Sequence, residues 1–192
     1  MKNTDANTAT IIEATRRNGI LISYMKKGNY NNPNAVGNVI RYILRDENCS
    51  KPNKKDVIYH GAYGATDLDI NMTIHQFEQV FAFNTRKTKK KRYIDHQVFS
   101  FNHNTEKRIK RHPELIPAMC SNMAEILSDG KYQVVYALQE PDTENDYYHI
   151  HFAINTVSFI GAKKRQENYI NTQRHHQELD DYIEELFYPH PF

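Results

Sequence analysis

The chain has 192 residues, of which 39% are apolar and 25% are charged, and its net charge at pH 7 is only +2. This composition predicts one ordered globular domain, and it excludes a low-complexity chain or a protein dominated by one sign of charge. No apolar run approaches the roughly 20 residues that a membrane span needs, and MKNTDANTAT is no signal peptide. The two cysteines, Cys49 and Cys120, lie in different segments, which excludes a disulfide framework and suits a reducing cytosol.

Apolar runs and turn residues in the first half of the chain predict strands that alternate with helices. In chain order we expect a strand at 20–25, a helix at 35–45 after the N-cap Asn34, a short strand at 57–60, a loop at 61–69, and a helix at 72–85 capped by Asn71. The apolar residues of the 35–45 segment share one face of the expected helix.

The second half is predicted to begin with a strand and to end with a helix. We expect a strand at 93–101, a helix from Pro113 to about Leu127 stopped by Asp129 and Gly130, strands at 132–138 and 148–157, a hairpin in SFIGAKK, and a helix at 169–187. Strands that neighbour in an antiparallel way and are mixed with helices predict an α+β layer fold.

One predicted strand carries polar residues at even spacing, within DYYHIHFAINTVSF (146–159). Successive side chains of a strand point to opposite faces, so His149, His151 and Asn155 share one face, while Ile150, Phe152 and Ile154 share the other. The two imidazoles would lie about 6–7 Å apart, close enough for one cation. Two histidine nitrogens suit a catalytic divalent metal, and the alternative is a solvated face of an antiparallel sheet.

The motif HIHFAIN resembles the third motif of the relaxase/mobilisation nucleases, which belong to the HUH endonuclease superfamily and nick one DNA strand at a transfer origin. YIDHQVFSF, with His96 ahead of the pair Ser100 and Phe101, resembles the second motif. VIRYILRDENCSK (39–51) is similar to the first motif, in which a helix carries the nucleophilic tyrosine before a lysine-containing loop. The resemblance covers residues 18–188 and implies an antiparallel sheet of about five strands flanked by helices.

The resemblance makes Tyr42 the catalytic residue, which would attack phosphorus, form a 5′-phosphotyrosine adduct, release a 3′-hydroxyl and later rejoin the strand. On a helical wheel Tyr42 lies about 100° from the centre of the apolar stripe, at the boundary where a hydroxyl can face a cleft. Tyr24 and Tyr30, which flank the first loop, are the rivals. The implied cofactor is a divalent metal, Mg²⁺ or Mn²⁺, bound by His149 and His151.

Here the chain departs from the family, which supplies a third histidine before the HxH pair, whereas this chain has none between His112 and His149. Gln139 replaces it by position, and Glu140 is the alternative as a better ligand for a hard metal. Three more residues have supporting roles. Asn155 orients a histidine or caps the strand end, Ser100 binds a phosphate oxygen or only the backbone, and His96 belongs to the site or to the core.

The basic residues are clustered, and these clusters are candidate contacts to single-stranded DNA and to the hairpin of the transfer origin, with solvated loops as the alternative. The candidates are Arg86, Lys87, Lys89, Lys90, Lys91, Arg92, Lys107, Arg108, Lys110, Arg111, Lys163, Lys164 and Arg165. The Tyr- and Asn-rich loop 28–34 could stack and hydrogen-bond bases.

The resemblance also implies a cytoplasmic bacterial protein without membrane insertion, with accessory transfer proteins and a secretion coupling protein as partners. Residues 1–10 are expected to be disordered and 11–192 to form one nicking domain, which can be the N-terminal part of a longer protein.

Three alternatives to this function stay open. These are a rolling-circle replication initiator using Tyr169 or Tyr182, a phosphoesterase with paired His-x-Thr motifs, whose second copy is missing, and a degenerate DNA-binding module.

Overall fold

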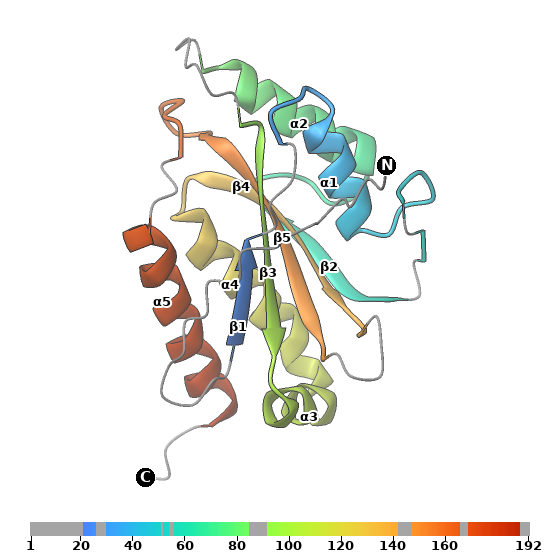
Figure 1. The fold of residues 1–192 in the computed structure, drawn as a ribbon, viewed down its shortest axis with the longest axis vertical. Coiled ribbons are helices and arrows are strands. Elements are labelled where there is room, and N and C mark those ends of the chain that lie inside the picture. Colours follow the sequence, from blue (N-terminus) through green and yellow to red (C-terminus); the bar gives the residue numbers. More distant parts are fainter. Residues whose placement is uncertain are drawn as a thin grey trace, which may run out of the picture.

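A computed structural model describes residues 21–25, 30–50, 52–53, 56–84, 92–141, 147–165 and 169–188, so the expected disorder of 1–10 lies outside the described residues. Five strands form one antiparallel sheet in the order β1-β3-β5-β4-β2 (Figure 1). They are β1 (Leu21–Met25), β2 (Val57–Tyr63), β3 (Ile94–Phe101), β4 (Tyr132–Gln139) and β5 (His149–Ser158). The histidine strand β5 therefore lies at the centre, between β3 and β4, and the α+β prediction is confirmed.

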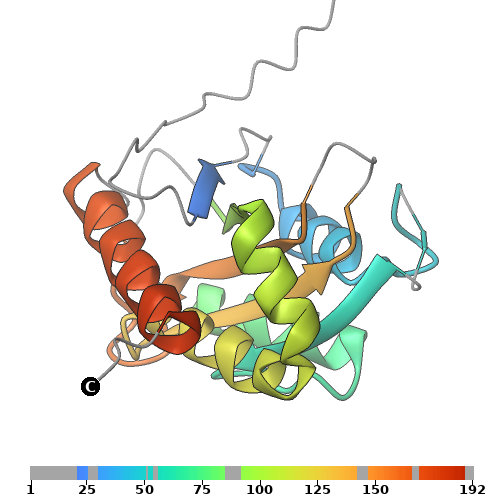
Figure 2. The same cartoon turned by 90° about the horizontal axis from the view of Figure 1, so that it is seen from below.

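Helices cover both faces of this sheet, because β5 and its neighbours carry apolar residues on each side. The helices are α1 (Ala35–Ile43), α2 (Ile70–Ala82), α3 (His103–Arg111), α4 (Ile116–Ser128) and α5 (Tyr169–Phe187). Figure 2 shows α1 above the sheet and α4 below it, while α3 lies at the end where β3 stops.

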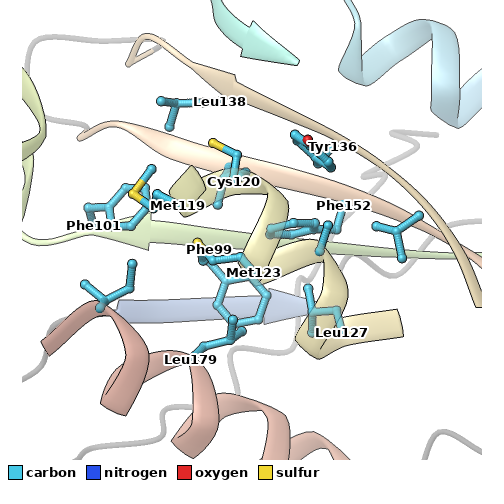
Figure 3. Close-up of a cluster of buried hydrophobic side chains, with 14 of the residues drawn as sticks. Phe99, Phe101, Met119, Cys120, Met123, Leu127, Tyr136, Leu138, Phe152 and Leu179 are labelled. Atoms are coloured by element: carbon cyan, nitrogen blue, oxygen red, sulfur yellow. The ribbon is translucent and has the colours of Figure 1, made fainter. Parts of the chain in front are cut away.

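The larger core lies between the sheet and the pair α4 and α5 (Figure 3). Phe99 from β3 and Phe152 from β5 meet edge to face, with ring centroids 5.8 Å apart. Leu127 and Leu179, from the two helices, are fully buried against this layer. Each such side chain contributes about 1.5–3 kcal/mol on burial, so this face is the main source of stability.

A second core lies on the opposite face, under α1 and α2, and it sets the position of the candidate site. The helix α1 buries the predicted stripe, Ala35, Val36, Val39, Ile40 and Ile43. These residues pack with Phe77 of α2 against Ile94, Val135 and Ala153 of the sheet. The last turn of α1 is thereby held over the middle of β5.

Most predicted elements are confirmed, and the differences have local causes. Asp69, not Asn71, caps α2, because its carboxylate accepts the N–H of Met72 at 2.7 Å. The strand β2 continues through Gly61, which sequence analysis assigned to a loop. Only glycine fits at this position of β2, because a Cβ there would lie 2.6 Å from the Tyr136 ring.

The helix α3 was not predicted, since its sequence HNTEKRIKR contains one large apolar residue, Ile109. A start signal is nevertheless present, because the Asn102 side chain accepts the N–H of Thr105 at 2.8 Å. The segment predicted as one helix from Pro113 is a 3-10 turn, Pro113–Leu115, followed by α4. Asp129 and Gly130 stop α4 with φ angles of 50° and 68°, as expected of a left-handed stop.

Candidate functional site

The register of the sheet places the polar residues of two strands on one face. His151 is opposite Val98, His149 is opposite Ser100, and His96 is opposite Ala153. Residues paired across an antiparallel ladder share a face, so His96, Ser100, His149 and His151 all lie on the α1 side of the sheet. The even spacing of the histidines thus gives the arrangement that was predicted for β5.

Each histidine of β5 has a hydrogen-bond partner for its Nδ1 atom. His151 Nδ1 lies 2.9 Å from His96 Nε2, and His149 Nδ1 lies 3.2 Å from the carbonyl oxygen of Tyr147. A carbonyl only accepts, so the His149 Nδ1 carries the proton and the lone pair is on Nε2. When His151 Nδ1 carries the proton as well, His96 Nε2 accepts the hydrogen bond between the two rings. In that tautomer both histidines of β5 have their lone pair on Nε2.

His96 is deeply placed in this cluster, with 3% of its surface exposed. Its Nδ1 lies 3.4 Å from the hydroxyl of Tyr30, and its ring centroid lies 5.2 Å from that of His151. These contacts place His96 beside the histidines of β5, and its role in the site stays a prediction. His96 joins the loop before α1 to the histidine strand.

Tyr42, in the last turn of α1, lies directly over these imidazoles. Its ring meets His96 and His151 edge to face, with centroids 6.0 and 5.9 Å apart. The side chain is half-buried, as the helical wheel predicted for a boundary position. The aromatic group from α1 and the histidines from β3 and β5 thus form one cluster.

The rival tyrosines differ from Tyr42 in their surroundings. Burial raises the pKa of Tyr30 to about 12, so formation of its phenolate is disfavoured. The hydroxyl of Tyr182 on α5 accepts a hydrogen bond from Asn122 at 3.0 Å, in the layer on the far side of the sheet. Tyr24 lies in β1 and Tyr169 in α5, and the side chains of both are outside the described residues.

Gln139, the predicted third ligand, is fully buried and has partners for both ends of its carboxamide. Its Oε1 accepts from Arg45 Nη2 at 2.9 Å, and its Nε2 donates to the Ile43 carbonyl at 2.6 Å. An oxygen that faces a guanidinium is poorly placed to bind a second cation. Glu140 lies near Tyr148, whose hydroxyl is 3.5 Å away, and Tyr148 belongs to the opposite core.

Arg45, which was not among the predicted site residues, is 1% exposed and follows α1. Its guanidinium carbon lies 5.1 Å from the centre of the Tyr42 ring, within the range of a cation–π contact. Its backbone is left-handed, with φ of 51°, which a non-glycine residue adopts only when its surroundings enforce it. The signal in the sequence is weak, because an arginine after an amphipathic helix is usually exposed.

Asn155 lies at the other end of the same face and does not contact the histidines. Its Nδ2 donates to the Phe77 carbonyl and to Gln133 Oε1, each at 2.9 Å, and its Oδ1 accepts from Val157 N at 3.1 Å. These bonds join β5 to α2 and to β4. They hold the end of β5 in place, and the two alternatives for the role of Asn155 stay predictions.

The basic candidates fall into different environments. Arg165 is 9% exposed and donates to Asp95 at 3.1 Å, and Arg92 also pairs with Asp95, so both support the fold. Lys107, Lys110 and Arg111 are exposed on α3, while Arg108 is half-buried there. Lys163 is exposed, and burial lowers the pKa of Lys164. The candidates Arg86, Lys87, Lys89, Lys90 and Lys91 lie outside the described residues.

Among the described residues, no three His, Cys, Asp or Glu side chains are grouped so that they could hold a metal ion. The histidines of β5 are thus a pair of possible ligands. Across the same part of the chain, no helix is long and apolar enough to cross a membrane.

The family model for relaxases, described as a MobA/VirD2-like nuclease domain, matches residues 42–186 of this chain. The chain therefore belongs to this relaxase family, as its motifs predicted. Its fold is similar to that of the MobM relaxase domain (MOBV; Mob_Pre), with a TM-score of 0.54 and 13% sequence identity over 87% of this chain and 86% of that one. That domain was crystallised bound to plasmid pMV158 oriT DNA with Mn. No curated protein matches the sequence.

Proposed function

We propose that this relaxase domain nicks single-stranded DNA at a transfer origin through the Tyr42 hydroxyl, and later rejoins the strand. The observation that supports this role most directly is the contact of the Tyr42 ring with His96 and His151. It joins the first, second and third motifs of the family in one place. Proposed partners are origin DNA, accessory transfer proteins and a secretion coupling protein.

His149 and His151 are the proposed ligands of a divalent metal, Mg²⁺ or Mn²⁺. Their chemistry fits, because neutral imidazoles are ligands for such ions and each ring here is oriented through Nδ1 by a hydrogen bond. When bound, the metal would neutralise charge on the scissile phosphate. The similar MobM domain contains Mn in its complex with DNA, which supports the choice of metal.

The chemical step forms a bond between the Tyr42 oxygen and phosphorus and breaks the bond from phosphorus to the 3′ oxygen. Tyr42 loses its proton to a base or a water molecule, and the departing 3′ oxygen gains one. Arg45 holds the Tyr42 ring in place through its cation–π contact and its bond to Gln139. Rejoining is the reverse reaction, in which the 3′-hydroxyl attacks the phosphotyrosine.

The location of the tyrosines separates this proposal from a rolling-circle replication initiator. Such an initiator places its tyrosine after the histidines, and Tyr182 is the candidate whose side chain is described. Its hydroxyl contacts Asn122 and the Ala118 carbonyl, on the α4 side of the sheet. The histidines face α1, so Tyr182 lies on the wrong side to reach their ligand.

The test is incubation of the protein with labelled single-stranded oligonucleotides from neighbouring mobile-element DNA, with Mn²⁺ or Mg²⁺, followed by a denaturing gel. We expect a covalent protein–DNA adduct that requires metal and is lost by at least a thousandfold in Tyr42→Phe, since the nucleophilic oxygen is gone. Tyr30→Phe is the matched control and should retain the adduct.

The outcomes distinguish the candidates for the nucleophile. An adduct that survives in Tyr42→Phe and is lost in Tyr30→Phe would assign the nucleophile to Tyr30. Binding of DNA without cleavage under any metal would instead support the degenerate DNA-binding module. Circular dichroism of each variant shows whether a loss of adduct reflects a loss of fold.

A further inference from the structure

A basic hollow lies along α3, and its side chains have no role in the cleavage site described above. Its lining residues are Asn104, Lys107, Arg108, Arg111 and Tyr188, and its volume is about 410 Å³. Three of these described side chains are cationic and none is a carboxylate. We propose that this hollow binds the phosphate backbone of single-stranded DNA next to the cleaved position, which rests on the function proposed above.

The spacing of the four residues from α3 explains how one helix presents them together. Asn104, Lys107, Arg108 and Arg111 stand at positions i, i+3, i+4 and i+7, so they form one stripe along the helix. The stripe is about 10 Å long at the helical rise of about 1.5 Å per residue. A single strand carries one phosphate per nucleotide, so a stripe of this length can reach more than one phosphate.

Arg108 is held in a fixed orientation at the bottom of this stripe. Its Nη1 donates to the Phe187 carbonyl at 2.6 Å, and its guanidinium carbon lies 3.9 Å from the centre of the Tyr188 ring. The Tyr188 hydroxyl in turn lies 3.3 Å from Thr105 Oγ1. A guanidinium has five N–H donors, so one bond to a carbonyl leaves donors for a phosphate, and little conformational entropy is lost on binding.

Cations near a helix C-terminus also stabilise the helix dipole, and this is the plain structural explanation for the sequence KRIKR. Lys110 fits that explanation, because it pairs with Glu106 at 2.5 Å, and this hydrogen bond raises the pKa of Lys110. Lys107 and Arg111 differ, because they are exposed and face the same hollow as Arg108. The concave arrangement of these cations is what favours an anionic ligand.

A short path of described residues connects the hollow with the histidine strand. The His149 Nδ1 atom donates to the carbonyl of Tyr147, and the Tyr147 ring lies 6.0 Å from that of His103, the first residue of α3. Tyr147 is 39% exposed, and His103 is exposed as well. A strand that leaves the cleaved position in this direction meets two rings on which bases can stack, and then the cations of α3.

The test measures DNA affinity without cleavage. Fluorescence anisotropy with labelled single-stranded DNA is recorded at several salt concentrations in the presence of EDTA, on the Tyr42→Phe background. The variant is Lys107→Ala with Arg111→Ala, because both side chains are exposed and their loss should not disturb the fold. The control is Lys131→Ala with Arg174→Ala, which removes the same charge near the turn between α4 and β4, where both side chains are exposed.

We expect weaker binding for the α3 variant at every salt concentration. The slope of log affinity against log salt should become shallower by about 1.4, since each phosphate contact on a single strand contributes roughly 0.7. The loss should be equal for origin and scrambled sequences, because phosphate contacts carry no sequence information. The control should bind as the parent does.

Three results would overturn the proposal. They are an α3 variant that binds like the parent, a control that loses as much affinity, and a loss restricted to the origin sequence. Failure of the proposed nicking function looks different. In that case the parent protein either does not bind DNA at all or binds it and forms no adduct with metal, whatever the α3 variant does.

Discussion

Polar residues lie at both ends of one face of β5, and their surroundings differ between the two ends. At the beginning of the strand, His149 and His151 are oriented through one ring nitrogen each. At the other end, Asn155 directs its whole carboxamide to backbone and side-chain partners from α2, β4 and β5. The difference lies in what covers each end, because Asn155 lies beneath Phe77 and the histidines lie beside Tyr42.

Even spacing along a strand identifies a shared face but not a shared function. All three residues belong to one motif, and a reading of the motif as a single site would assign Asn155 to the metal. In the structure Asn155 has 0% of its surface exposed and joins two layers. The motif thus combines the two proposed metal ligands with a residue that holds the end of the strand in place.

The largest effect is expected from removal of a proposed ligand. His151→Ala should weaken Mn²⁺ binding by more than the 10–100-fold that is typical when only an outer-shell partner is lost. Asn155→Ala, at the other end of the strand, should bind Mn²⁺ normally and lose about 1–3 kcal/mol of stability, because buried partners become unsatisfied. Calorimetric titration with Mn²⁺ and urea unfolding measure the two effects. Equal loss of metal binding in both variants would contradict the proposal that His151 binds the metal while Asn155 only supports the fold.

An intermediate effect is expected at His96, which contacts His151 from β3. His96→Phe removes the acceptor of the His151 Nδ1–H and should weaken Mn²⁺ binding by about 10–100-fold. His96→Gln keeps an acceptor oxygen and should retain much of the affinity. If His96→Phe lost as much affinity as His151→Ala, His96 would be a ligand itself, and its proposed orienting role would be refuted.

The smallest effect on Mn²⁺ affinity is expected at Gln139, which takes the place of the family's third histidine but has other partners. Gln139→Ala should bind Mn²⁺ as the parent protein does, because the carboxamide faces Arg45 and the Ile43 carbonyl. Its free energy of unfolding should fall by about 1–3 kcal/mol, since both groups lose a buried partner. The same titration and unfolding measurements apply. A large loss of Mn²⁺ affinity would restore Gln139 as the third ligand.

Much of the fold followed from apolar spacing, and the exceptions have physical reasons. The stripe of 35–45 and the alternation in β5 are strong signals, and both elements were found where they were expected. The helix α3 has almost no apolar stripe, so only its cap residue Asn102 could have indicated it. Gly61 resembles a loop residue in the sequence, and only the close approach of the Tyr136 side chain explains why this strand position is a glycine.

The candidate site was predictable where a motif determined it and unpredictable where tertiary contacts did. Tyr42 and the histidines were placed by motif, and the sheet brings them together. The bond between Arg45 and Gln139 joins residues 94 positions apart, and a single sequence contains no sign of it. The burial of Arg165 with Asp95 was equally invisible, so it was grouped with exposed cations.

The hydrogen bond between Arg45 and Gln139 also limits the movement of α1. It ties the residues just after α1 to the last residue of β4, while the first turns of α1 pack in the core under α2. The backbone that carries Tyr42 is therefore held at both ends of α1. On the function proposed above, the DNA strand would bend or unstack to bring a phosphate to the Tyr42 hydroxyl, so origins that deform easily should be nicked fastest.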